Sequence, residues 1–169
     1  MHKTNNWIID ADIARGAGTT VHPISKNCRG FLDFVRINGH QFSADHKIRE
    51  EWHKHQSLYS KKWFASMIAR KKVKFVVNTI DVDSIIYAAP VNDSIKKIAL
   101  KDSHLVQTSL EHGAVIASGD DNAKNAFCCI SDSYLIIKGV IWLNPKNNFG
   151  EIKEKFIKKE QCDPLWKIA

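Results

Sequence analysis

Two short apolar runs in this chain each end on an acidic residue. One is Trp7-Ile8-Ile9-Asp10, and the other is Ala114-Val115-Ile116-Ala117-Ser118, which leads to Gly119-Asp120-Asp121. Continuous apolar runs of this length are typical of strands buried on both faces, as in a parallel sheet. In open α/β sheets, binding and catalytic sites form where such strands end. If the two strands are neighbours, their carboxylates meet at one edge of the sheet.

Amphipathic helices are expected between the strands. The pattern predicts helices over 25–36, 44–54, 58–72, 102–112, 121–127 and 151–159. Further strands are expected over 41–43, 73–77 and 134–143, the last either whole or as two pieces around Gly139, while residues 78–100 give no clear pattern. Strands alternating with helices predict an α/β fold: a three-layer α/β/α sandwich with a mostly parallel central sheet and a Rossmann-like topology.

Length and composition fit a single domain. The chain has 169 residues, 44% of them hydrophobic and 25% charged, and no repeat or linker divides it, so we expect one domain over 1–169. No stretch approaches the roughly 20 apolar residues that a membrane span requires. The start lacks the apolar region and cleavage site of a signal peptide. We therefore expect a cytoplasmic protein with no membrane partner.

The cysteines agree with that compartment. Cys28, Cys128, Cys129 and Cys162 form no C-x-x-C pair, and two of them are adjacent. This suits neither a disulfide scaffold nor a structural zinc site. We expect reduced thiols that mostly fill the core.

Basic residues are concentrated in the middle of the sequence. The chain has a net charge of +7, and residues 45–74 alone contribute +6, from nine basic and three acidic residues. Such a segment can bind the phosphates of a nucleic acid, because neutralising them releases counterions. It can equally be a solvated helix face. The candidate nucleic-acid contacts are Arg15, Lys61, Lys62, Arg70, Lys71 and Lys72.

Further acids are expected at the edge where the two apolar strands end. Asp12 follows Asp10, Glu51 lies on the helix after the second strand, and Asp102 starts the helix that leads to the Asp120 strand. Carboxylates without a His/Cys ligand set suit hard cations such as Mg²⁺ or Mn²⁺ rather than zinc. Such ions lower the pKa of a water molecule and clamp the oxygens of a phosphodiester under attack. The acids therefore predict metal-dependent phosphodiester hydrolysis.

Four stretches resemble the acidic motifs of PIN-domain nucleases, in order and at familiar spacings. They are Trp7-Ile8-Ile9-Asp10-Ala11-Asp12, Ile48-Arg49-Glu50-Glu51-Trp52, Lys101-Asp102-Ser103-His104-Leu105 and Ala117-Ser118-Gly119-Asp120-Asp121. The resemblance covers nearly the whole chain and implies a metal-dependent endoribonuclease that acts on single-stranded RNA. It also implies catalytic and metal-binding roles for Asp10, Glu51, Asp102 and Asp120, with Asp12 and Asp121 as auxiliary ligands or electrostatic support.

The chain departs from the family pattern in three places. Glu50 and Glu51 are adjacent, so either can be the helical acid; Asp12 stands where the family often has Asn; and the chain continues further after Leu143 than the short toxins of the family. By analogy, the resemblance implies a toxin or defence effector, with an antitoxin or other regulatory protein as its partner, and it allows a homodimer.

Several residues have a second interpretation. Asp102 and Asp121 can be helix N-caps, and Ser118 can position a water or a phosphate oxygen or satisfy the backbone. Four histidines are expected on the surface or in packing, with His104 nearest the acids: His53, His55, His104 and His112. Three tryptophans are expected in the core rather than against bases: Trp52, Trp63 and Trp142.

Two other functions remain open on the sequence. Asp10-Ala11-Asp12 also resembles the strand end of haloacid-dehalogenase-type phosphatases, with Asp10 as nucleophile and Asp12 as general acid/base. That resemblance would add Thr79, Lys97 or Lys101, and Gly119-Asp120-Asp121, but it has Ala14 where Thr or Val is usual and gives Glu51 and Asp102 no role. The other alternative is a non-catalytic nucleic-acid-binding module that uses residues 45–74.

Overall fold

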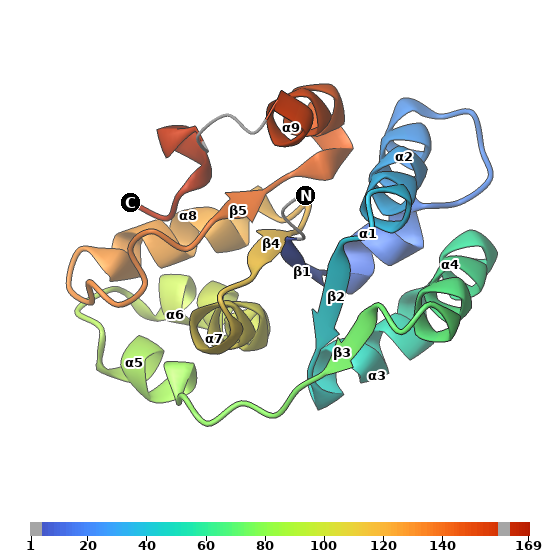
Figure 1. Cartoon of the computed structure of the whole chain (residues 1–169). Helices are drawn as coiled ribbons and strands as arrows, with labels where there is room; N and C mark the ends of the chain where they lie inside the picture. Colours follow the sequence, from blue (N-terminus) through green and yellow to red (C-terminus); the bar gives the residue numbers. More distant parts are fainter. Residues whose placement is uncertain (1–4, 159–162) are drawn as a thin grey trace.

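A computed structural model of the chain describes residues 5–158 and 163–169. These residues form a five-stranded sheet in the order β3-β2-β1-β4-β5, and every neighbouring pair is parallel (Figure 1). The strands are β1 (Asn6–Ile9), β2 (Gln41–Ala44), β3 (Val73–Phe75), β4 (Val115–Ala117) and β5 (Trp142–Leu143).

Helices cover both faces of this sheet (Figure 1). One face carries α2 (Pro23–Ile37), α4 (Leu58–Ala69) and α9 (Pro145–Lys158). The other carries α5 (Val82–Ala88), α6 (Asp93–Lys101), α7 (Ser103–His112) and α8 (Asp121–Ser131). Two further helices, α1 (Ala11–Gly16) and α3 (His46–His55), follow the carboxyl ends of β1 and β2, and a 3-10 turn spans Pro164–Trp166. The predicted three-layer α/β/α sandwich is thus confirmed.

The strand order reverses between β1 and β4. From β1 the chain moves to β2 and β3 on one side, and then crosses to β4 and β5 on the other. Ile9 pairs with Ala117, so the two strands end level with each other. In open α/β sheets, such a reversal leaves a crevice at the carboxyl ends of the strands. The two strands that end on acidic residues are therefore neighbours, as the predicted site requires.

The buried side chains form one cluster around the sheet. Trp52, Trp63 and Trp142 lie in it, as expected. The indole of Trp52 donates a hydrogen bond of 2.6 Å to the carbonyl of Ile9, the last residue of β1. That bond holds α3 against the end of β1, since an indole N–H buried without a partner would carry a desolvation penalty.

Several predicted element boundaries are wrong. The helix predicted from residue 25 begins at Pro23, after the N-cap His22, because the fixed φ of proline suits the first helical turn. The helix predicted over 58–72 ends at Ala69, since Lys71 has a φ of 55°. The helix predicted over 44–54 begins at His46, where the Asp45 carboxylate caps it at the amide of Ile48.

Other parts of the chain differ more from the prediction. Residues 78–100, which gave no clear pattern, contain α5 and α6, and α1 was not expected at all. Of the strand predicted over 134–143, only Trp142–Leu143 forms a strand, and turns occupy residues 135–139. The last helix begins at Pro145 rather than at 151, because a non-helical Asn148 interrupts its pattern, and its expected end at 159 lies outside the described residues.

The three cysteines in the described part of the chain are free thiols, and they differ in burial. Cys28 is buried, Cys128 is half-buried and Cys129 is exposed, while Cys162 lies outside the described residues. The expectation of core thiols is confirmed for Cys28 and wrong for Cys129. Burial raises the pKa of the Cys28 thiol to about 11, which keeps it protonated. No helix in the described part of the chain is long and apolar enough to cross a membrane.

Candidate active site

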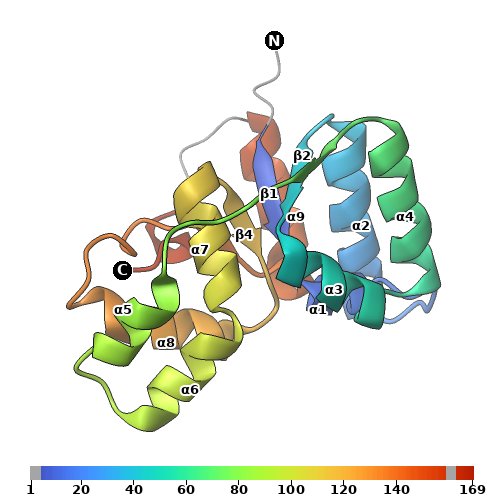
Figure 2. The ribbon, with the colours of Figure 1, turned by 90° about the horizontal axis from the view of Figure 1, so that it is seen from below.

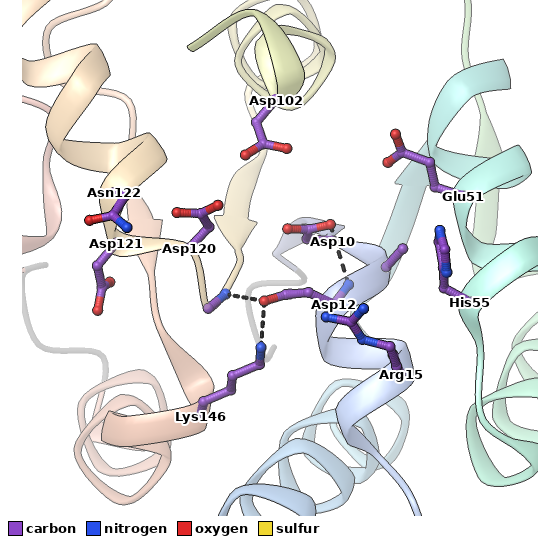
Figure 3. A pocket seen from close by; sticks show the side chains of 12 residues that line it. Asp10, Asp12, Arg15, Glu51, His55, Asp102, Asp120, Asp121, Asn122 and Lys146 are labelled. Atoms are coloured by element: carbon purple, nitrogen blue, oxygen red, sulfur yellow. Dashed lines mark hydrogen bonds and ion pairs between the residues drawn. The ribbon is translucent and has the colours of Figure 1, made fainter. Parts of the chain in front are cut away.

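A pocket of about 520 Å³ opens at the carboxyl edge of the sheet (Figure 3). All six acids predicted from the sequence line it: Asp10, Asp12, Glu51, Asp102, Asp120 and Asp121. They come from five parts of the fold, namely the end of β1, α1, α3, the α6–α7 junction and the start of α8. Arg15, His55, Asn122 and Lys146 complete the polar lining. The structure therefore brings together residues that are more than 100 positions apart.

Asp10 is the most buried of these acids, with 8% of its surface exposed. Its Oδ2 accepts a hydrogen bond of 2.7 Å from the buried hydroxyl of Ser118, and the same hydroxyl accepts one of 3.1 Å from the amide of Asp120. Ser118 thus links the end of β1 to the loop after β4. This arrangement fixes the direction of the Asp10 carboxylate.

Two of these acids, Asp10 and Asp102, have raised pKa values, as expected for carboxyl groups that are buried beside like charges. Burial, and next the negative charge of Asp12, raises the pKa of Asp10 to about 8. Burial also raises the pKa of Asp102 to about 6, and the charges of Asp120 and Glu51 add to the effect. A group held away from its charged form in a polar pocket is a common mark of a functional site.

The acids that precede and follow β4 in the sequence differ in the hydrogen bonds that their side chains accept. Asp120 caps α8, because its Oδ1 accepts a hydrogen bond of 2.9 Å from the amide of Ala123. The cap expected at Asp121 is therefore wrong by one residue. Asp121 instead accepts a bond of 2.9 Å from the side-chain amide of Asn144. Asp102 occupies the N-cap position of α7, as expected, but its carboxylate accepts no capping hydrogen bond from the described residues of that helix.

Glu51, rather than Glu50, faces the pocket. The Oε2 of Glu51 hydrogen-bonds to His104 Nε2 at 3.1 Å, while Glu50 lies on the exposed side of α3, 3.5 Å from His46. Burial raises the pKa of Glu51, but the hydrogen bond and the charge of His104 outweigh burial, so that its pKa is below the usual value. His104 is buried beside the acids, as expected from its position next to Asp102.

Asp12 is held by a lysine from the far end of the sequence. Lys146 Nζ, in the first turn of α9, lies 2.6 Å from Asp12 Oδ2, and the amide of Gly119 donates to the same oxygen at 3.0 Å. The other oxygen, Oδ1, is buried with no hydrogen-bond partner among the described residues. A Cβ at position 119 would lie 2.4 Å from Lys146 Cδ and 2.7 Å from Asp12 Oδ2. Only glycine allows this close approach.

Sequence reasoning missed three residues of the pocket: His55, Asn122 and Lys146. His55 was expected on the surface or in packing, and it is exposed at the end of α3, where it also lines the pocket. A signal for Lys146 existed, because Pro145 comes two residues after the apolar run that ends at Leu143, and proline favours the first position of a helix. A helix start at residue 145 would have placed Lys146 at the carboxyl edge of the sheet.

The predicted nucleic-acid contacts do not form one surface. Arg15 lines the pocket, and Lys61 and Lys62 lie near the start of α4, which the structure holds to α1 by a 3.2 Å hydrogen bond from the Ser57 amide to the Ala14 carbonyl. The run Arg70, Lys71 and Lys72 follows the other end of α4 and precedes β3, at the amino edge of the sheet. The structure therefore separates this run from the pocket.

The donors in the pocket suit a hard divalent cation. They are carboxylate oxygens, the ligands that Mg²⁺ and Mn²⁺ prefer. The pKa of Asp10 is raised by burial and then by the negative charge of Asp12, and a bound cation would oppose both effects. Among the described residues, no group of three or more His, Cys, Asp or Glu side chains is already arranged to hold a metal ion. The residues that would hold it are Asp10, Asp102, Asp120 and Glu51, whose carboxylates line the same space (Figure 3).

The chain matches no protein-family model, no curated protein and no solved structure.

Proposed function

We propose that the protein is a Mg²⁺- or Mn²⁺-dependent endoribonuclease of the PIN-like kind, which hydrolyses phosphodiester bonds in single-stranded RNA. The observation that carries the proposal is the convergence of Asp10, Glu51, Asp102 and Asp120 on one open pocket. Burying like charges together lowers the stability of a fold unless a ligand compensates for it. Such a cluster at the strand-order reversal therefore supports a catalytic role.

The residues of the pocket divide into those that would hold the ion and those that position them. A bound divalent ion supplies an activated water and stabilises the leaving oxygen of a phosphodiester. Asp10 would hold the ion as a carboxylate, with its proton released to solvent, because only the charged form is a good ligand. Ser118 keeps Asp10 in place, and His104 does the same for Glu51. Arg15 places a guanidinium at the pocket, where it can bind a phosphate of the substrate.

The phosphatase alternative fits the pocket less well. Thr79, its second-motif candidate, donates from its amide and its hydroxyl to Glu111, at 2.6 and 2.7 Å, and is not among the residues that line the pocket. The two candidate lysines, Lys97 and Lys101, line a different groove. The lysine that does line the pocket, Lys146, bonds to Asp12 rather than to Asp10. The nuclease proposal uses all four converging acids.

The test is cleavage of an end-labelled single-stranded RNA by the wild type, by Asp10→Asn and by Asp83→Asn. Asp83 is an exposed acid on α5 outside the pocket, so its variant removes the same charge without touching the site. We expect the wild type and Asp83→Asn to cleave with Mg²⁺ or Mn²⁺ and to stop when EDTA is added. Asp10→Asn should lower the rate by about a hundredfold or more, the scale of losing a key electrostatic group.

Two results would contradict the proposal. One is cleavage that persists in EDTA or in Asp10→Asn. The other is release of phosphate from a phosphomonoester by a wild type that leaves RNA intact, which would identify the phosphatase.

A further inference from the structure

We infer that a groove between α5 and α6 binds the part of a single-stranded RNA that extends beyond the cleavage site. The inference rests on the proposed function and names a contact surface outside the acidic pocket. The groove has a volume of about 550 Å³ and is lined by Tyr87, Asp93, Lys96, Lys97, Leu100 and Lys101. An aromatic ring, an apolar side chain and three cations in one groove are the components of sequence-tolerant single-strand binding.

Tyr87 supplies the stacking surface. It lies in the last turn of α5, and 65% of its surface is exposed. Lys96 Nζ donates a hydrogen bond of 2.8 Å to the carbonyl of Tyr87, which joins the end of α5 to α6. The backbone that carries the ring is therefore held in place. An exposed ring on a fixed backbone can stack on a base without a large entropic cost of ordering.

The lysines give the groove a charge opposite to that of RNA. Residues 75–133 are acidic as a whole, with four basic and eight acidic residues, yet three of the four basic residues line this groove. Lys97 and Lys101 are one turn apart on α6, and both are exposed. Side chains four residues apart lie on the same helix face, so two ammonium groups can contact neighbouring phosphates of one strand.

The groove and the acidic pocket have lining residues that are adjacent in the chain. Lys101 is the last residue of α6, and Asp102, the next residue, lines the pocket. Lys47 Nζ, from α3, donates a hydrogen bond of 3.3 Å to the carbonyl of Lys101 and so ties this junction to the other side of the pocket. Figure 2 shows α6 at the same end of the molecule as α1 and α3. We therefore infer that an RNA strand leaving the pocket past Asp102 reaches the groove next to Lys101.

The test is binding of a fluorescent single-stranded RNA, followed by anisotropy in EDTA so that no cleavage occurs. The variants are Tyr87→Ala and the double variant Lys97→Ala/Lys101→Ala. Matched controls are Tyr87→Phe, which keeps the ring, and Lys71→Ala/Lys74→Ala, which removes two exposed cations at the amino edge of the sheet. All these side chains are exposed, so folding should be preserved, and a circular dichroism melt checks this.

We expect Tyr87→Ala to weaken RNA binding by about 5- to 150-fold, the effect of losing one base stack. The double lysine variant in the groove should lower the slope of log affinity against log salt by about 1.4, because two phosphate contacts are lost. Both controls should bind like the wild type. With Mn²⁺ present, the groove variants should raise KM more than they lower kcat, because the groove touches no reacting atom.

Three results would overturn the inference. RNA binding could be unchanged in the groove variants, it could fall equally in Lys71→Ala/Lys74→Ala, or the wild type could fail to bind RNA at all. A fluorescent polyglutamate peptide tests the other chemistry that would fit: if only the peptide depends on the groove, its occupant is an acidic protein segment. If the wild type cleaves RNA and the groove variants bind RNA normally, the inference about the groove is wrong and the proposed nuclease function stands. If RNA binding depends on the groove but the wild type does not cleave RNA, the groove binds RNA and the proposed nuclease function is wrong.

Discussion

The two edges of the sheet treat charge in opposite ways. At the carboxyl edge, acids spread from residue 10 to residue 121 converge on one pocket, and Asp10 is almost fully buried. At the amino edge, a contiguous basic run leaves Arg70, Lys71 and Lys74 exposed to solvent. The basic residues, which are neighbours in the sequence, form a solvated surface, whereas the acids, which are neighbours only in the fold, form a pocket. Charge density along the chain is therefore a weaker guide to a site than the positions where strands end.

The difference has an energetic cause. An exposed lysine keeps its hydration and affects folding little, but a buried carboxylate loses hydration and repels its neighbours. The raised pKa values of Asp10 and Asp102 record that loss. A fold that keeps such groups gives up stability at this edge, which is common where function requires it.

The largest effect that would sharpen this contrast is the response of stability to pH and metal. The pKa of Asp10 is about 8 in the folded protein, against an ordinary value of 3.8, so the metal-free folded state binds a proton that the unfolded chain releases. The free energy of unfolding should therefore fall as pH rises from about 4 to about 8, by several kcal/mol. Urea denaturation in EDTA at pH 5 and pH 8 measures this.

Millimolar Mg²⁺ or Mn²⁺ should reverse the loss at pH 8, because a cation stabilises the charged carboxylates. Asp10→Asn should be more stable than the metal-free wild type at pH 8 and should respond less to metal. Asp83→Asn, at an exposed site, should behave like the wild type. Two results would contradict this prediction: a free energy of unfolding in EDTA that does not change with pH, or a melting temperature that does not change with metal.

A smaller effect is expected from the close contact between Gly119 and its neighbours. In Gly119→Ala the new methyl group would overlap Lys146 and Asp12, whereas at Gly18 nothing lies within 4 Å of an added Cβ. Gly119→Ala should cost about 1 to 3 kcal/mol of stability, the range for overpacking, and should reduce cleavage because the Asp12–Lys146 pair is displaced. Gly18→Ala should change stability by less than about 0.5 kcal/mol. Thermal melts and cleavage rates of both variants compare them, and equal behaviour would show that the pocket tolerates the overlap.

Much of the fold could be predicted from the sequence because its strongest signals are local. Apolar runs such as Trp7-Ile8-Ile9 and the Gly113 stop of α7, with its left-handed φ of 61°, depend on a few adjacent residues. The four converging acids could also be predicted, since each ends a strand or lies on a helix near that edge. Their convergence on one site requires that β1 and β4 are neighbours, which the structure shows.

The rest could not be predicted, because it depends on contacts that are distant in the sequence or on local patterns with two solutions. The ion pair between Asp12 and Lys146 spans 134 positions, and no local sequence pattern predicts that these two residues are partners. Leu135 and Ile136 are apolar and look like part of a strand, yet both are exposed in a run of turns. The helix α1 was missed because it is six residues long and begins directly after Asp10, which caps it.

The smallest effect is expected from substitutions of two histidines on α7, one at each edge of the sheet. His104 hydrogen-bonds to Glu51 at the carboxyl edge, and His112, two turns later on α7, hydrogen-bonds to the side chain of Asn78 at 3.1 Å. Replacing either with leucine removes one hydrogen bond and should cost about 1 kcal/mol of stability. Only His104→Leu releases an acid of the pocket, so it alone should lower the cleavage rate, by about tenfold. His104→Gln, which can still donate to Glu51, should recover part of that rate, and equal rates in His104→Leu and His112→Leu would show that Glu51 needs no fixed position for the reaction.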